Sequence, residues 1–133
     1  MLIRKQRIDR GIAAMREQNV DMWIALGRDV QHKGEPMLRY LLTFDMSGPV
    51  AVILTRSGKK YAINAPLETE ELESMGLFDK VFVNTEGYEG IKEIIADLVR
   101  RENPQRIALN FSEKDSTSDG LSLTSYRVLT EAF

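Results

Sequence analysis

The chain has 133 residues, a formal net charge of −2 at pH 7 and no cysteine. Its length allows one domain with a substantial core, and its interspersed charges give no basic face for nucleic acid. The lack of cysteine excludes disulfides, thiol nucleophiles and Cys-ligated metal sites. No apolar run approaches the ~18 to 20 residues of a membrane span, and residues 1–10 lack the apolar core of a signal peptide. We therefore expect a cytoplasmic protein with a single domain over residues 1–133, without nucleic-acid or membrane partners.

The first two predicted elements are a helix and a buried strand. Apolar residues recur at helical spacing over residues 3–18, with Gly11 packed between them; they are Ile8, Ile12 and Met15. Residues 20–26, VDMWIAL, are apolar at nearly every position, which predicts a central strand covered on both faces. Trp23 lies inside this strand, so we expect it in the core rather than in a ligand site.

Residues 27–47 form the least regular part of the sequence. They are rich in polar side chains and follow the predicted central strand, which is a usual position for a binding site in an α/β protein. A short helix is expected over residues 36–42, because Pro36 suits the first turn of a helix.

Two short apolar runs, residues 50–54 and 60–63, predict a hairpin because the turn between them contains Gly58. An acidic helix follows at residues 68–75, and Gly76 suits its end. The four glutamates of this helix do not share one face, and acidic residues are favoured near a helix N-terminus. We interpret them as structural rather than metal-binding.

The second half of the chain alternates strands and helices. Residues 81–83 predict a strand, and the apolar residues between 91 and 99 recur at i, i+3, i+4 and i+7, which predicts an amphipathic helix. Asn103 and Pro104 are expected to end that helix. The whole order of elements predicts an α/β fold, a three-layer sandwich around a five-stranded mixed sheet.

The last segment predicts a strand, a polar loop and a closing helix. Ile107, Ala108, Leu109 and Phe111 make the strand, and Ser122 or Thr124 offers an N-cap for the helix. The apolar residues of that helix are spaced for one face. They are Tyr126, Val128, Leu129 and Phe133.

A resemblance to a known family rests on this last segment. The residues that carry it are Asn110, Phe111, Ser112, Asp119, Gly120, Leu121 and Tyr126. Together they resemble the end of the N-terminal domain in the creatinase/prolidase/aminopeptidase P family, the pita-bread metallopeptidases that cleave Xaa-Pro bonds. The resemblance implies a ribonuclease H-like α/β fold, in agreement with the order of elements.

The resemblance also implies what this chain does and lacks. In the family a separate C-terminal domain holds two divalent metal ions, such as manganese, and that catalytic domain is expected to be absent from this chain. The family's ligands and catalytic groups include more than one His, whereas His32 is the only one here. We expect no catalytic or metal-binding residue and no cofactor in this chain, which would serve as a non-catalytic domain for oligomerisation and active-site gating, with a homodimer as the assembly.

Four residues are candidates for an active-site rim. In the family's dimers, a loop of one N-terminal domain lies at the rim of the neighbouring subunit's active site, and residues 23–42 are similar to the segment that contains it. Arg and protonated His pair with anions through charge-assisted hydrogen bonds, so these side chains could meet a substrate carboxylate. They are Arg28, His32, Arg39 and Tyr40. The alternative for His32 is an exposed loop residue without a role.

Other classes of function stay open or are disfavoured. A stand-alone α/β binding or scaffolding module without peptidase activity is the main alternative, and a divergent hydrolase with its own site in residues 28–45 is a third. A ribonuclease H-like nuclease is disfavoured because Asp21 lies only at the beginning of its strand. A serine hydrolase is disfavoured because Gly-x-Ser-x-Gly does not occur.

Overall fold

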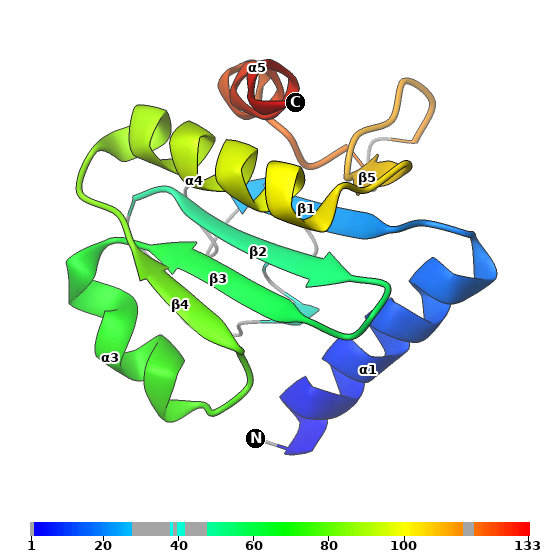
Figure 1. The fold of residues 1–133 in the computed structure, drawn as a ribbon, viewed down its shortest axis with the longest axis horizontal. Helices are drawn as coiled ribbons and strands as arrows, with labels where there is room; N and C mark the ends of the chain where they lie inside the picture. The colour runs from blue at the N-terminus through cyan, green and yellow to red at the C-terminus, as the bar shows by residue number, and fades with distance from the viewer. Residues whose placement is uncertain (1, 28–37, 39, 42–47, 116–118) are drawn as a thin grey trace.

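The computed structural model describes residues 2–27, 38, 40–41, 48–115 and 119–133. Leu38, Tyr40 and Leu41 are helical, and the rest of the short helix predicted at residues 36–42 lies outside the described residues. The other elements, labelled in Figure 1, are α1 (Leu2–Glu17), β1 (Met22–Gly27), β2 (Val50–Thr55), β3 (Lys60–Asn64), α3 (Pro66–Ser74), β4 (Lys80–Val83), α4 (Gly87–Glu102), β5 (Ile107–Leu109) and α5 (Leu123–Ala132).

The sheet has five strands in the order β4-β3-β2-β1-β5. Strand β2 is antiparallel to β1 and β3, whereas β5 is parallel to β1 and β4 is parallel to β3. The expected mixed sheet is therefore confirmed. The prediction that β1 is the central strand is wrong in detail: β1 is internal, but β2 occupies the middle, and all six of its residues are buried.

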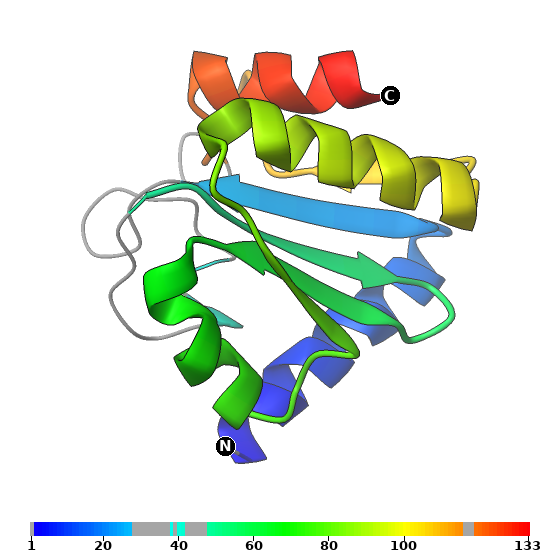
Figure 2. The same ribbon diagram turned by 60° about the vertical axis from the view of Figure 1, so that its left-hand side comes forward.

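Helices cover both faces of this sheet, which confirms the three-layer sandwich. Figure 2 shows α4 and α5 on one side of the sheet and α1 and α3 on the other. Ile8, Ile12 and Met15 of α1 pack with Leu54 in one buried cluster, as the helical spacing predicted. The residues of α4 and α5 pack in a second cluster on the opposite face.

Gly11 and Trp23 show how closely α1 approaches the sheet. A Cβ atom on Gly11 would lie 3.4 Å from Leu54 Cδ1 and 3.5 Å from the Trp23 ring, so a methyl group at this position would be in ordinary van der Waals contact with both side chains. Trp23 packs at the edge of the core, and its Nε1 donates a hydrogen bond to Asn110 Oδ1 at 2.8 Å. Trp23 is thus a core residue, as predicted, and the bond links β1 to the segment after β5.

Residues with suitable backbone or side-chain properties stand where the helices begin and end. Asn103 ends α4 in a left-handed conformation, with φ at 47°, and Gly76 follows α3 with φ at 65°. Helix α3 begins at Pro66, slightly earlier than expected, because proline suits the first turn. Of the two N-cap candidates for α5, Ser122 is the cap, since its Oγ accepts the N–H of Ser125 at 3.1 Å.

The predicted apolar face of α5 is only half right. The buried face consists of Ser125, Val128, Leu129 and Ala132, whereas Tyr126 and Phe133 are 38% and 50% exposed. Small Ser125 and Ala132 occupy the i−3 and i+4 positions around Val128, so that the helix lies close to its neighbours. Phe111, predicted in the last strand, instead follows the end of β5 and is 48% exposed.

Candidate functional site

The sheet brings four strand ends to one edge. Because β1, β3, β4 and β5 all run in the same direction, their carboxyl ends lie together, opposite to the end of β2. Ligands of open α/β sheets bind outside this edge. The predicted rim segment follows β1 here, so the topology gives it a suitable position.

Only one of the four candidate rim residues belongs to the described part of the chain. Arg28, His32 and Arg39 lie outside it, so their placement stays a prediction. Tyr40 is described, and its side chain is 43% exposed. The Arg7 guanidinium lies 4.6 Å from the centre of the Tyr40 ring, and Arg7 Nη1 donates a hydrogen bond to the Tyr40 carbonyl oxygen at 2.6 Å.

Arg7 was not among the residues singled out from the sequence. Helix α1 carries several arginines, and no local sequence pattern distinguishes Arg7 from the others. Its partner, Tyr40, lies 33 positions later in the chain. Its guanidinium stacks on the ring and also bonds the backbone, so it holds the exposed Tyr40 against α1. Arg7 therefore positions the only described rim candidate.

Two buried asparagines shape the loops at the same edge. Asn84 donates from Nδ2 to the Gly87 carbonyl oxygen at 2.8 Å and accepts the N–H of Glu86 on Oδ1 at 3.1 Å. Asn64 donates from Nδ2 to the Ala65 carbonyl oxygen at 2.7 Å. Both amides bond the backbone that leaves β3 and β4, so they support the loops instead of presenting reactive groups.

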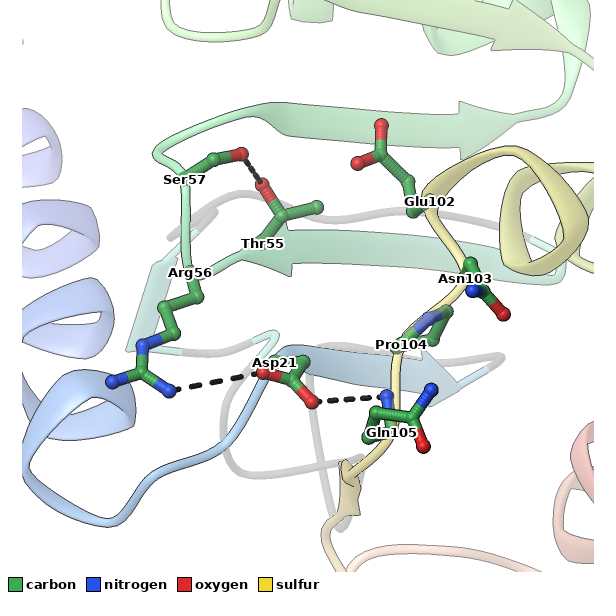
Figure 3. A pocket seen from close by; sticks show the side chains of 8 residues that line it. All are labelled: Asp21, Thr55, Arg56, Ser57, Glu102, Asn103, Pro104 and Gln105. Carbon is green, nitrogen blue, oxygen red and sulfur yellow. Dashed lines mark hydrogen bonds and ion pairs between the residues drawn. The ribbon is translucent and has the colours of Figure 1, made fainter.

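A polar pocket lies at the opposite edge of the sheet (Figure 3). Its volume is about 260 Å³, and it lies between the start of β1, the β2–β3 turn and the connection from α4 to β5. The six residues of β1, roughly 20 Å at the usual rise per residue, separate it from the edge with the rim segment. The pocket is lined by Asp21, Thr55, Arg56, Ser57, Glu102, Asn103, Pro104 and Gln105.

Asp21 is the central carboxylate of this pocket. Its Oδ2 accepts the backbone N–H groups of Gln105 and Arg106, both at 2.9 Å, and its Oδ1 lies 3.8 Å from Nη1 of Arg56. These contacts join the start of β1 to the start of β5 and to the β2–β3 turn. The carboxylate therefore stabilises the sheet, and the nuclease hypothesis gains no support from it.

We expect Asp21→Ala to lower the free energy of unfolding by about 1 to 3 kcal/mol, because two backbone N–H groups lose their acceptor. Asp21→Asn keeps an acceptor oxygen and should cost less. Urea denaturation of both variants and the unchanged chain measures the difference. Equal losses for the two variants would show that charge, and not the shared acceptor, carries the effect.

A second polar cluster borders the pocket at Glu102. The Tyr61 hydroxyl donates to Glu102 Oε1 at 2.9 Å, and Lys59 Nζ lies 3.3 Å from the same oxygen. Burial and the hydrogen bond to Glu102 raise the pKa of Tyr61 to about 12. The protonated phenol is therefore part of the folded arrangement.

Stability should fall in alkali because of Tyr61. Its pKa is about 12 in the folded state against a usual value of 10.0, so between these values the unfolded state binds fewer protons. The contribution is fully present below pH 10 and is lost as the pH rises through 12. Absorbance titration of tyrosinate should show one of the four tyrosines ionising last. Tyr61→Phe should remove that late step; if the step persists, another tyrosine carries it.

The described residues do not fit the two-metal centre that the family resemblance implies. Among the side chains that the structure describes, no three His, Cys, Asp or Glu lie close enough to share a metal ion. Glu70, Glu71 and Glu73 of α3 are exposed. Asp21 and Glu102 are engaged with backbone and side-chain donors. No chemical step through a metal ion can be derived from this part of the chain.

No described helix is long and apolar enough to cross a lipid bilayer. No family model and no curated protein sequence matches the chain. Solved structures, in contrast, share its fold.

Three of these solved structures show how far the similarity in fold extends. An Xaa-Pro dipeptidase from Bacillus anthracis matches 98% of this chain with a TM-score of 0.69 at 17% identity. The N-terminal domain of an Xaa-Pro dipeptidase from Lactobacillus brevis matches 95% of the chain, also with a TM-score of 0.69 at 17% identity. A Creatine_N superfamily domain of a dipeptidase from Streptococcus thermophilus matches 96% of the chain with a TM-score of 0.60 at 16% identity.

The share of each matched protein that this chain covers shows that the similarity extends over one domain. This chain spans only 31% of the B. anthracis dipeptidase but 87% of the L. brevis N-terminal domain and 86% of the S. thermophilus domain. The fold expected from the last segment of the sequence is therefore present over nearly the whole chain. The chain has the fold of the creatinase/prolidase N-terminal domain that Xaa-Pro dipeptidases contain.

Proposed function

We propose that residues 1–133 are the non-catalytic N-terminal domain of an Xaa-Pro dipeptidase or aminopeptidase P-like metallopeptidase. The observation that carries this proposal is the match to the L. brevis dipeptidase domain, which covers 95% of this chain and 87% of that domain. In the proposal, a separate domain supplies the divalent metal ions, such as manganese, and cleaves the bond before proline. The present domain supports assembly, limits access to the active site and works in the cytoplasm.

The proposed gating role belongs to the segment after β1. Arg28, His32, Arg39 and Tyr40 would line the rim of a neighbouring subunit's active site and meet the carboxylate of a short peptide. Two observations support this role: the segment begins at the carboxyl edge of the parallel strands, and Tyr40 is exposed while Arg7 holds it in place.

The gating role can be tested in the protein that joins this domain to a catalytic domain. His32→Ala should raise the KM for an Xaa-Pro dipeptide by about tenfold, because a charge-assisted hydrogen bond to the substrate is lost. The relative rate on longer peptides should rise as well. Lys114→Ala, an exposed substitution elsewhere on the surface, serves as the control. Unchanged KM and unchanged length preference for His32→Ala would contradict the gating role.

The non-catalytic role has its own test. The purified 133-residue chain, incubated with an Xaa-Pro dipeptide and Mn²⁺, should release no proline above the buffer rate. A catalytically active Xaa-Pro dipeptidase under the same conditions is the positive control. Turnover by this chain that depends on Mn²⁺ would contradict the proposal.

A scaffolding module is the second candidate. It is favoured by the match to the N-terminal domain of the FACT complex subunit SPT16 from Cicer arietinum, which covers 87% of this chain with a TM-score of 0.59 at 11% identity. SPT16 is a subunit of a complex, so a domain with this fold also occurs in a protein that takes part in an assembly. If the protein that carries this chain hydrolyses no Xaa-Pro dipeptide, the scaffolding candidate replaces the first.

A further inference from the structure

The polar pocket at the start of β1 has no part in the functions proposed above. Its volume of about 260 Å³ lies just below the roughly 300 to 1,000 Å³ of pockets that hold drug-sized ligands, so it suits a smaller molecule. The length of β1 separates it from the edge with the rim segment. A ligand in this pocket would therefore lie away from the proposed active-site rim.

Glu102 lines the pocket with a carboxylate that has one oxygen available. Its Oε1 accepts the Tyr61 hydroxyl at 2.9 Å and lies 3.3 Å from Lys59 Nζ. Its Oε2 accepts no hydrogen bond from the residues that the structure describes. The Glu102 side chain is only 18% exposed, so its two partners hold the carboxylate in place while Oε2 can still accept from a ligand.

The surroundings of Glu102 also favour a positively charged group. Helix α4 ends here, and the last carbonyl groups of a helix carry partial negative charge. Arg100 and Arg101 of the same turn pair with another carboxylate and do not line the pocket. The hydroxyl oxygens of Thr55 and Ser57, 2.9 Å apart, are further acceptors. A primary ammonium group, with three donors, suits such a set of acceptors.

Arg56 gives the opposite side of the pocket a positive charge (Figure 3). Its Nη1 donates to Asn19 Oδ1 and lies 3.8 Å from Asp21 Oδ1. Its Nη2 and Nε have no partner among the described residues. A guanidinium that is held through one nitrogen can still donate to the carboxylate of a ligand. Pro104 adds an apolar part to the wall.

We propose that this pocket binds a free α-amino acid with a small apolar side chain. The ammonium group donates to Glu102 Oε2 and the Ser57 hydroxyl, the carboxylate accepts from Arg56, and the side chain lies against Pro104. A zwitterion satisfies both charged sides of the pocket, whereas Ca²⁺ or Mg²⁺ needs about six ligands. This inference goes beyond the proposed non-catalytic function and depends on neither gating nor peptidase activity.

Amide NMR spectra of the ¹⁵N-labelled 133-residue chain test the site. L-alanine should shift the amide signals of Ser57 and Gln105, which line the pocket, but not that of Asn84 at the other edge of the sheet. The dissociation constant should be on the order of 1 to 10 mM, because charged groups in an open site stay partly hydrated. Glycine and L-leucine, titrated in parallel, test the contact with Pro104.

Two derivatives of L-alanine test its two charged groups separately. N-acetyl-L-alanine lacks the ammonium group, and L-alaninamide lacks the carboxylate. Each should bind at least about tenfold more weakly than L-alanine, because one charge-assisted hydrogen bond is lost. Equal binding of either derivative would overturn the assignment of an amino acid to this pocket.

A matched pair of variants tests the role of Glu102. Glu102→Gln keeps an oxygen for the Tyr61 hydroxyl but removes the charge, so it should weaken the binding of L-alanine about tenfold. Glu93→Gln removes the same charge from an exposed position of α4 and should leave binding unchanged. Circular dichroism checks that both variants are folded. No saturable shift with any of the three amino acids, or binding that Glu102→Gln leaves unchanged, would overturn the proposal.

Discussion

Gly90→Ala should lower the free energy of unfolding by about 2 to 4 kcal/mol, the range of severe overpacking. In an ordinary helix interior the same change is stabilising by about 0.5 to 1 kcal/mol. Here a Cβ atom would lie 1.9 Å from Asn84 Oδ1 and 2.9 Å from Glu86 Cβ. Asn84 is 7% exposed and its amide holds the entry of α4, so it cannot move without losing buried hydrogen bonds. Urea denaturation measures the loss.

Two variants make the Gly90 prediction specific. Glu93→Ala changes an exposed residue of the same helix and should alter stability by less than about 0.5 kcal/mol. In an Asn84→Ala background, Gly90→Ala should cost less, because the nearest clashing atom is gone. If Gly90→Ala stabilises the otherwise unchanged chain, Asn84 does not lie as close to Gly90 of α4 as the structure places it.

Ile24→Ala is the second substitution with a large expected effect. Ile24 is fully buried, pairs with Ile53 on one side and with Leu109 on the other, and packs in the cluster beneath α4 and α5. Removing three carbon atoms there leaves a cavity between three strands and two helices. We expect a loss of about 2 to 5 kcal/mol in the free energy of unfolding, measured by urea denaturation with an unchanged m-value.

Two further variants test whether the loss of stability in Ile24→Ala comes from the loss of buried packing at this position. Ile24→Val removes a single methylene and should cost about 0.5 to 1.5 kcal/mol. Leu67→Ala removes a similar apolar side chain from a site that is 89% exposed, and it should cost less than about 0.5 kcal/mol. Similar losses for Ile24→Ala and Leu67→Ala would contradict the assignment of the core.

The elements with strong local patterns could be predicted from the sequence. The i, i+3, i+4 spacing of α1 and α4 and the β-branched run of β2 depend on side chains near in sequence, and each element lies where its pattern placed it. The segment around Asn110 also indicated the fold, and the bond from Trp23 to Asn110 gives a physical reason why an asparagine suits that position.

Features that depend on tertiary contacts could not be predicted in this way. Strands β1 and β2 have equally apolar sequences, so only the pairing shows that β2 is in the middle. The outward side of α5 is apolar as well, so spacing alone did not distinguish its buried face from its exposed face. Asp21 meets Gln105 and Arg106 across 84 and 85 positions, a separation that leaves no local signal.

The candidate active-site rim could also be predicted only in part. The resemblance selected Arg28, His32, Arg39 and Tyr40, and the sheet topology explains why a segment after β1 lies at a ligand-binding edge. The role of Arg7 emerged only from the structure, because its contact with Tyr40 joins two elements far apart in the chain.

Titration of Mn²⁺ into the 133-residue chain by calorimetry measures whether this domain itself holds the catalytic metal ions. We expect no saturable binding at micromolar concentrations, since the described side chains offer no cluster of three metal ligands. An active Xaa-Pro dipeptidase stripped of its metal serves as the positive control. Saturable binding of Mn²⁺ with micromolar affinity would instead indicate a metal site within this chain and overturn the proposed non-catalytic role.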